Sequence, residues 1–240
     1  MMLYHYFDST IGPFRNLSDL PEEEDIMNDE KTMRILKNHF TKRLKRALKK
    51  RGEKDAAVLT RQYEARFQKY MKEADFGEEN QRFTSFLNIY LGLAAYELLR
   101  EKGYSQEEAI VVYDEMSRTM RRIAALSYRL VDLLPGGFGA AVKSIRDDLL
   151  GPKAVCWDTT VTEDSERCFE YKITKCLYYD TCKAHGFPEF TRVFCEHDRH
   201  AYDVLHRQAK FVRYSAIGEG GEICHDVFIN VKSAKHTGGK

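Results

Sequence analysis

The chain of 240 residues is long enough to bury a hydrophobic core, either as one large domain or as two small ones. Its 43% hydrophobic and 31% charged residues are ordinary for a globular protein, and its net charge of +1 gives no general attraction to nucleic acid or to an anionic membrane. Because it has neither an apolar run of about 18 residues nor the basic-then-apolar pattern of a secretory signal, we expect a cytoplasmic protein.

The first part of the chain is predicted to be helical. Residues 1–30 are expected to be irregular, since they contain Gly12-Pro13 and the acidic run PEEED. From Lys31 onward, apolar residues recur at steps of three and four, which predicts a helical region over 31–152. Ser105 and Glu108 form a capping box. Within this region we expect helices over about 31–51, 55–74, 83–103, 105–134 and 140–150.

The first of these helices carries a row of basic side chains that could contact phosphates or anionic lipid. A solvated helix face beside acidic neighbours is the simpler interpretation, because the total charge is balanced. We therefore expect no nucleic-acid partner and no membrane partner. The basic residues in question are Lys42, Arg43, Lys45, Arg46, Lys49, Lys50 and Arg51.

After Pro152 the sequence pattern changes from helical spacing to alternation. The segments AVCWDTTVT and RCFEYKITKC are rich in β-branched and aromatic residues and predict a β-hairpin. Helices are expected over 177–186 and 189–207, and two further strands around the turn at 218–221. The fold class is therefore α+β, with a small antiparallel sheet in the order β-β-α-α-β-β, helices on one of its faces and a domain over 153–232. Residues 233–240 are expected to form a flexible tail.

The chemically reactive residues gather in this last third. All six cysteines follow Lys153, and without an export signal we expect them to be reduced thiols, either buried or functional. The densest stretch is VFCEHDRH at 193–200. If it is helical, Cys195 and Asp198 lie three residues apart on one face. The pair His197 and His200 has H-x-x-H spacing, which is a weak metal signal, and we interpret both as bystanders.

A second cluster lies in the segment EICHDVF. In a strand, Cys224 and Asp226 share one face and His225 takes the other. Phe228 continues the first face, which indicates that Asp226 points toward the helices. A buried carboxylate needs a partner, and Arg213 on the preceding strand is the natural candidate.

Cys176 is expected where the second strand passes into a helix. A thiol at a helix N-terminus has a lowered pKa because the dipole favours the thiolate, although a small buried hydrophobic role is the alternative. Cys176, Cys195 and Cys224 come from three different elements that this topology can bring together.

Read together, these segments resemble the L-2-amino-thiazoline-4-carboxylic acid hydrolase family over about residues 154–231. The resemblance lies in a cysteine that closes a strand, a G-x-P-E segment, a C-x-x-D element, an arginine in the next strand and a final G-x-x-C-x-D strand. Here these are Cys176, Gly186 with Pro188 and Glu189, Cys195 with Asp198, Arg213, and Gly221 with Cys224 and Asp226. The chain departs from the pattern in reading HGFPE at the second element and in placing His225 between Cys224 and Asp226.

The resemblance implies a hydrolase that opens a small cyclic amidine or thiazoline carboxylate at its amidine-like carbon. Such a carbon needs a nucleophile and an acid for the departing nitrogen or sulfur. Cys195 or Cys224 can attack, with Cys176 in the same site, and Asp198 or Asp226 can move protons. Arg213 is expected to hold the substrate carboxylate through a bidentate pair, with Glu189 as a further substrate-binding residue.

Two other classes of function stay open at this point. In the first, a non-catalytic module binds zinc or a small molecule through Cys176, Cys195 and Cys224, joined by His225 or Cys182. In the second, an interaction protein docks through the basic helix. Our prediction is the enzyme, with a small-molecule substrate and no cofactor or metal, leaving zinc and a homo-oligomer as open alternatives.

Overall fold

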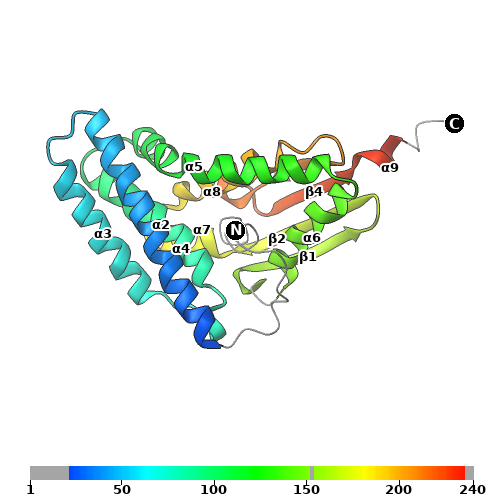
Figure 1. Cartoon of the computed structure of the whole chain (residues 1–240), viewed down its shortest axis with the longest axis horizontal. Helices are drawn as coiled ribbons and strands as arrows, with labels where there is room; N and C mark the ends of the chain where they lie inside the picture. Colours follow the sequence, from blue (N-terminus) through cyan, green and yellow to red (C-terminus); the bar gives the residue numbers. More distant parts are fainter. Residues whose placement is uncertain (1–21, 152–153, 236–240) are drawn as a thin grey trace. The chain divides into compact units, whose positions relative to one another are not determined.

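The computed structural model describes residues 22–151 and 154–235 (Figure 1). The chain divides into two compact units, Met1–Thr119 and Met120–Lys240. The boundary between the units falls inside a helix, whereas the change of sequence pattern lies near residue 152. Most of the expected irregular segment 1–30, and residues 236–240 of the expected tail, lie outside the described residues. None of the described helices has the length and apolar character that a membrane crossing requires.

The first unit is built from helices, as predicted. It contains α2 (Glu22–Lys50), α3 (Ala56–Glu73), α4 (Phe83–Glu101) and the first part of α5 (Gln106–Leu133), with the short 3-10 turn η2 (Glu78–Asn80) before α4. Helix α2 begins at Glu22, earlier than the expected Lys31.

Helix α4 is the buried centre of the first unit, because it is apolar nearly all round. Tyr63 of α3 donates its hydroxyl proton to the carbonyl of Leu91, 3.2 Å away. The predicted capping box is confirmed at the start of α5: the Ser105 N–H donates to Glu108 Oε2 at 2.7 Å, and the Glu108 N–H donates to Ser105 Oγ at 3.2 Å.

The second unit contains a four-stranded antiparallel sheet with the strand order β1-β2-β4-β3. The predicted α+β class and the predicted order of strands and helices are both confirmed. The strands are β1 (Trp157–Asp164), β2 (Cys168–Cys176), β3 (Ala209–Ser215) and β4 (Cys224–Asn230). The other elements are α6 (Gly137–Leu150), η3 (Ala154–Cys156), α7 (Leu177–Ala184), η4 (Pro188–Thr191), α8 (Arg192–Tyr202), η5 (Ile217–Glu219) and α9 (Val231–Lys235).

One face of this sheet packs against helices through a core of aromatic rings. Phe211 and Phe228 stand opposite each other on β3 and β4, with ring centroids 4.9 Å apart. Tyr202 at the end of α8 contacts both rings at 5.1 Å, and Tyr128 of α5 contacts Tyr202 at the same distance. Arg146 of α6 lies over the ring of Phe169 on β2. Helix α8 is thereby held against the inner face of β3 and β4.

The turn between α8 and β3 is fixed by one buried carboxylate. Asp132 near the end of α5 is only 1% exposed, and its two oxygens accept the backbone N–H groups of residues 206 to 209 at 2.7–3.1 Å. Burial alone would raise the pKa of Asp132, but these four N–H donors outweigh it and lower the pKa. Helix α8, expected to run to 207, therefore ends at Tyr202, where the chain turns toward Asp132.

Candidate active site

A buried ion pair joins the last two strands on the inner face of the sheet. Arg213 and Asp226 stand directly opposite each other on β3 and β4. Arg213 Nε donates to Asp226 Oδ1 at 2.7 Å and Nη2 donates to Oδ2 at 2.8 Å, with the two side chains 6% and 2% exposed. The Tyr171 hydroxyl on β2 donates to Oδ2 at 3.1 Å. The predicted partner of Asp226 is thus confirmed, and the carboxylate is bound on both oxygens.

The same guanidinium also contacts helix α8. Arg213 Nη1 donates to the carbonyl oxygen of Cys195 at 2.9 Å, and Nη2 lies 3.7 Å from Asp198 Oδ2. Arg213 therefore connects β3, β4 and α8 in one set of charged contacts. Since all three of its nitrogens are engaged and the side chain is nearly buried, this geometry does not favour the predicted role of holding a substrate carboxylate.

Asp198 differs from Asp226 in its access to solvent. It keeps 33% of its side-chain surface exposed, against 2% for Asp226. Its enclosed surroundings raise the pKa of Asp198, the charge of Arg213 opposes that rise, and the negative charge of Asp226 adds to it. A carboxylate with a raised pKa and an accessible edge suits proton transfer.

The three predicted thiols lie around this charged cluster. Cys195 Sγ packs so closely against Gly218 that a Cβ built on that glycine would stand 2.7 Å from it. The Cys224 Sγ accepts the N–H of Ile217, 3.4 Å away, on the same short turn η5. The charge of Cys176 would act on both of the other thiols. Cysteines from β2, α8 and β4 are thus close enough to influence one another electrostatically.

The surroundings of all three thiols raise their pKa values and so favour the protonated form. Burial raises the pKa of Cys224 to about 12 and raises the pKa of Cys195 further, with Asp198 contributing to the latter. For Cys176 the expected lowering of the pKa is wrong: burial raises it, although the N–H groups of Tyr179 and Tyr178 at the start of α7 act in the opposite direction. The helix terminus is present, but desolvation is the larger effect.

The model of the L-2-amino-thiazoline-4-carboxylic acid hydrolase family matches residues 26–228. The chain belongs to this family. No curated protein and no solved structure matches it. The match extends well beyond residues 154–231, where the motifs lie, so the helical first unit belongs to the family pattern as well.

The family membership gives a chemical frame for the cluster, since the family is named for a hydrolase. Proton transfer and nucleophilic attack are the two operations that such a reaction needs. The surroundings of Arg213 supply one accessible carboxylate and neighbouring thiols. The other predicted residues are placed differently.

Glu189 lies in η4, and its charge contributes to the high pKa of the buried Cys182 thiol, which burial raises to about 12. His225 points away from Cys224 and Asp226, as predicted, and its Nε2 lies 2.6 Å from Glu170 Oε1 on the outer face of the sheet. A zinc site that combines His225 with the three inner thiols is therefore not favoured.

The two histidines of α8 differ in their burial. Burial, with the charge of Arg121, lowers the pKa of His197 to about 3, so its imidazole is neutral. His200 is exposed.

Sequence reasoning missed two residues that shape the cluster. Tyr171 was absent from the predicted site, although the alternation of β2 puts it on the buried face with Phe169 and Ile173. Gly218 was interpreted only as a turn residue. It also allows η5 to approach Cys195 and Thr191, since a Cβ there would stand 2.9 Å from Thr191 Cγ2. Close backbone approach of this kind leaves no local signal in a sequence.

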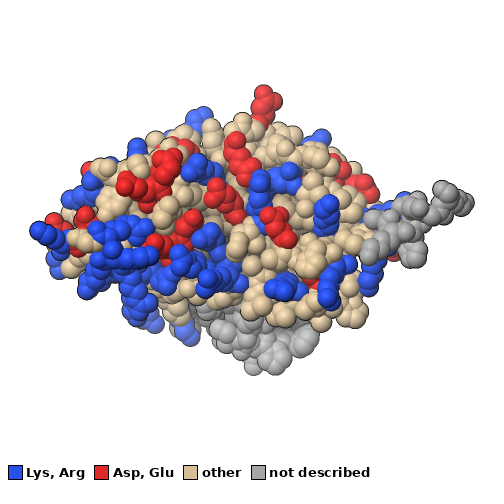
Figure 2. Space-filling model, turned by 90° about the horizontal axis from the view of Figure 1, so that it is seen from above, with Lys and Arg blue, Asp and Glu red and all other residues tan. Residues whose placement is uncertain are grey.

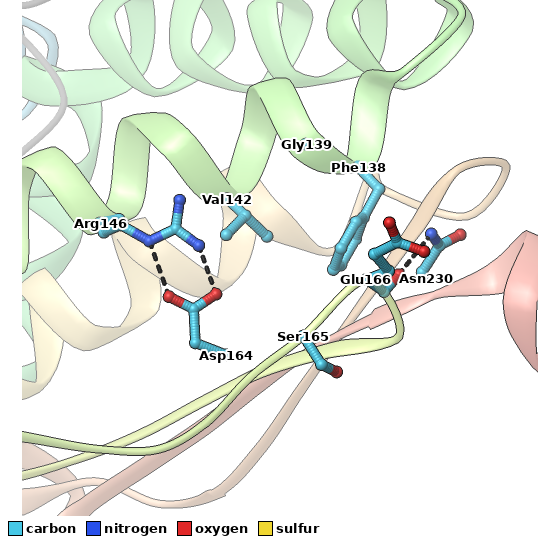
Figure 3. Close-up of a pocket in the computed structure, with 8 residues that line it drawn as sticks. All are labelled: Phe138, Gly139, Val142, Arg146, Asp164, Ser165, Glu166 and Asn230. Atoms are coloured by element: carbon cyan, nitrogen blue, oxygen red, sulfur yellow. Dashed lines mark hydrogen bonds and ion pairs between the residues drawn. The ribbon is translucent and has the colours of Figure 1, made fainter.

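A shallow depression elsewhere in the second unit is separate from these residues (Figure 3). It lies between α6 and the β1–β2 turn, where Arg146 forms an ion pair with Asp164 and Asn230 donates to the carbonyl of Glu166 at 2.8 Å. In each of these two pairs the polar groups bind each other. None of the predicted catalytic residues lines the depression. It gives no support for a second reaction site.

The basic helix has the mixed surroundings that a solvated face would have. Figure 2 shows blue and red side chains intermixed on the face in view. Arg51, which directly follows α2, binds the carboxylate of Glu115 at 3.0 and 3.2 Å, and Arg43 of α2 donates to the backbone carbonyl of Glu115. Part of the positive charge is thus used inside the first unit.

Proposed function

We propose that the second unit carries a hydrolytic site that opens a small cyclic amidine or thiazoline carboxylate, with Cys195 as nucleophile and Asp198 as the proton-transfer group. One observation supports this most directly. Asp198, the accessible carboxylate of the cluster, lies one helical turn from Cys195, and the Arg213–Asp226 pair stands beside both.

The charge of the substrate explains how a thiol with a high pKa can react. A protonated amidine-like group is a cation, and a cation beside Cys195 and Asp198 lowers the pKa of both. Asp198 then accepts the thiol proton while Sγ bonds to the amidine-like carbon. The ring bond to the departing sulfur or nitrogen breaks, and Asp198 returns the proton to that atom. Water then cleaves the bond between Cys195 Sγ and the substrate carbon and regenerates the thiol.

In this proposal Arg213 and Asp226 are positioning residues. Arg213 holds α8 through the carbonyl of Cys195, and Asp226 with Tyr171 holds Arg213. Cys224 and Cys176 complete the wall of the site, and Glu189 on η4 is the remaining candidate for contact with the substrate. The reaction as written requires no cofactor or metal.

The test uses the purified full-length protein with L-2-amino-thiazoline-4-carboxylate and, as a second substrate, its ring-oxygen analogue. We expect Cys195→Ser and Asp198→Asn each to lower kcat by about 100-fold to 10,000-fold. Cys168→Ser, a cysteine on the outer face of the sheet, and Asp180→Asn, an exposed carboxylate on α7, are the matched controls and should keep wild-type turnover. Far-UV circular dichroism checks that each variant is folded.

The proposed bond between Cys195 Sγ and the substrate carbon can be tested by mass spectrometry. Rapid acid quenching followed by intact-mass analysis should find the substrate carbon fragment attached to wild-type protein, with peptide mapping assigning it to Cys195. Turnover that survives Cys195→Ser but not Asp198→Asn would replace the thiol by an activated water. Turnover that survives both substitutions would overturn the proposed site.

A further inference from the structure

Arg192, the first residue of α8, differs from the neighbouring arginines because it has no partner among the described residues. Arg213 binds a carboxylate and the carbonyl of Cys195, and Arg199 binds both oxygens of Glu219 on η5. The Nε of Arg192 is buried and has no hydrogen-bond partner. Because nearly all buried polar groups are hydrogen-bonded, this donor calls for an acceptor that the chain itself does not supply.

A second buried polar group stands next to it in the chain. Thr191, the last residue of η4, is only 1% exposed, and its Oγ1 has no oxygen or nitrogen partner among the described residues. The hydroxyl contacts the thiol of Cys182, which is a weak hydrogen-bonding group. A guanidinium and a hydroxyl can both donate protons. The ligand that satisfies both therefore carries two acceptor oxygens and a negative charge, as a carboxylate does.

Both residues lie close to the proposed nucleophile. Arg192 precedes Cys195 by three positions in α8, so their side chains are neighbours on the helix surface. Thr191 Cγ2 and Cys195 Sγ lie 2.9 and 2.7 Å from the position that a Cβ on Gly218 would take, so both atoms contact the same point of η5. Thr191 therefore borders the proposed site directly, and Arg192 stands one helical turn from Cys195.

Along α8, Cys195 stands between a positive and a negative residue. Arg192 precedes it by three positions and Asp198 follows it by three, which places the two charged residues about 9 Å apart along the helix axis. A thiazoline carboxylate carries opposite charges at the two ends of its ring, a carboxylate and a protonated amidine-like group. When its amidine-like carbon meets Cys195 Sγ, the cationic end can face Asp198 and the anionic end can face Arg192.

We propose that Arg192 and Thr191 form the subsite for the substrate carboxylate, with the guanidinium and the hydroxyl as donors to its oxygens. The inference rests on the proposed hydrolysis at Cys195. It gives to Arg192 the role that the sequence predicted for Arg213. It also names the substrate class more narrowly, since a cyclic amidine with a carboxylate on its ring is preferred to the same ring without one.

The test compares L-2-amino-thiazoline-4-carboxylate with 2-amino-2-thiazoline, which has the same ring and no carboxylate, on the full-length protein. Arg192→Met should raise KM for the first compound by about 10-fold to 100-fold with little change in kcat, since hydrogen bonds between charged groups are strong. KM for the second compound should stay unchanged. Arg192→Lys should recover part of the loss, because lysine keeps the charge but not the planar pair of donors.

Two further variants separate binding from folding. Arg199→Met removes an arginine of the same helix that is paired with Glu219, and it should leave both KM values unchanged. Thr191→Val should raise KM for the carboxylate compound alone. It should not lower the urea midpoint, because it replaces a buried hydroxyl that lacks a strong partner with a methyl group of the same size. A clear loss of stability would assign that hydroxyl to the fold and overturn its part in the subsite.

The outcomes distinguish this subsite from the hydrolysis itself. If Arg192→Met raised KM equally for both compounds, or kept the preference for the carboxylate, the subsite would be overturned and the hydrolase would stand. If the wild type hydrolysed neither compound, calorimetry would still test the subsite. Carboxylate-dependent binding that Arg192→Met removes would support it without the hydrolysis, and failure of the wild type to bind either compound would overturn both.

Discussion

Replacement of Arg213 by methionine tests whether the second unit depends on the buried charge pair. The substitution keeps an unbranched apolar side chain of similar length but removes two hydrogen bonds to Asp226 and one to the carbonyl of Cys195. Asp226 would then be 2% exposed with Tyr171 as its one described hydrogen-bond donor. Removing one partner of a buried ion pair costs about 3–5 kcal/mol, because the other charge stays buried without compensation.

The single tryptophan makes this loss measurable in the right part of the chain. Trp157 lies in β1, with its ring 6.2 Å from that of Tyr178, so its fluorescence reports unfolding of the second unit. In urea titrations followed by this signal, we expect Arg213→Met to lower the free energy of unfolding by about 3–5 kcal/mol with little change in the m-value. That is a large share of the 5–15 kcal/mol typical of a domain.

Arg199→Met is the matched control, because it breaks an exposed pair. Arg199 contacts both oxygens of Glu219 at 2.9 and 3.0 Å, but the two side chains are 47% and 32% exposed. Its loss should cost no more than about 1 kcal/mol. The double variant Arg213→Met with Asp226→Leu should be more stable than Arg213→Met alone, since no buried charge is left. Equal costs for Arg199→Met and Arg213→Met would refute the reasoning.

The predictable parts of this fold were those encoded by neighbouring residues. The strands of the second unit follow from alternation, which also placed Cys224 and Asp226 on one face and His225 on the other. The capping box at Ser105 is a pattern of four residues. Such features need only the local period of the chain and a turn signal.

The parts that could not be predicted depend on contacts distant in sequence. Asp132 sits within a helical pattern, and nothing near it indicates that residues more than 70 positions later bring their N–H groups to its oxygens. Arg213 was matched correctly to Asp226, but its third contact, with the carbonyl of Cys195, depends on how α8 packs on the sheet. That contact is the reason why we propose a positioning role for Arg213 in place of the expected binding of substrate.

The pKa of Cys176 also depends on contacts that are distant in sequence, and it was therefore not predicted correctly. Its position at the start of α7 was predicted correctly, and the N–H groups of the helix do lower the pKa. Desolvation depends on every atom packed around the sulfur, which a local pattern does not specify. Because desolvation raises the pKa of Cys176 more than the helix N–H groups lower it, a helix N-terminus alone does not identify a reactive thiol.

Two further substitutions test how the site is held in place. Asp132→Asn should cost about 2–3 kcal/mol at pH 7, since hydrogen bonds to a charged group are the strong ones. Because the folded state lowers the pKa of Asp132, its stabilisation is full above the unfolded-state value near 3.9 and is lost as pH falls through the folded-state value. Urea midpoints measured from pH 7 to 3 should therefore fall less steeply for Asp132→Asn than for the wild type, and parallel curves would contradict this account. Gly218→Ala should destabilise the second unit by about 1–3 kcal/mol and reduce turnover, because the new Cβ would lie 2.7 Å from Cys195 Sγ and force α8 and η5 apart. Gly139→Ala is its control: no heavy atom lies within 4 Å of a Cβ on this helical residue, so alanine should stabilise the chain by about 0.5–1 kcal/mol. If Gly218→Ala behaved like Gly139→Ala in both stability and turnover, Cys195 would not be held against η5, and the approach of that turn would have no part in forming the site.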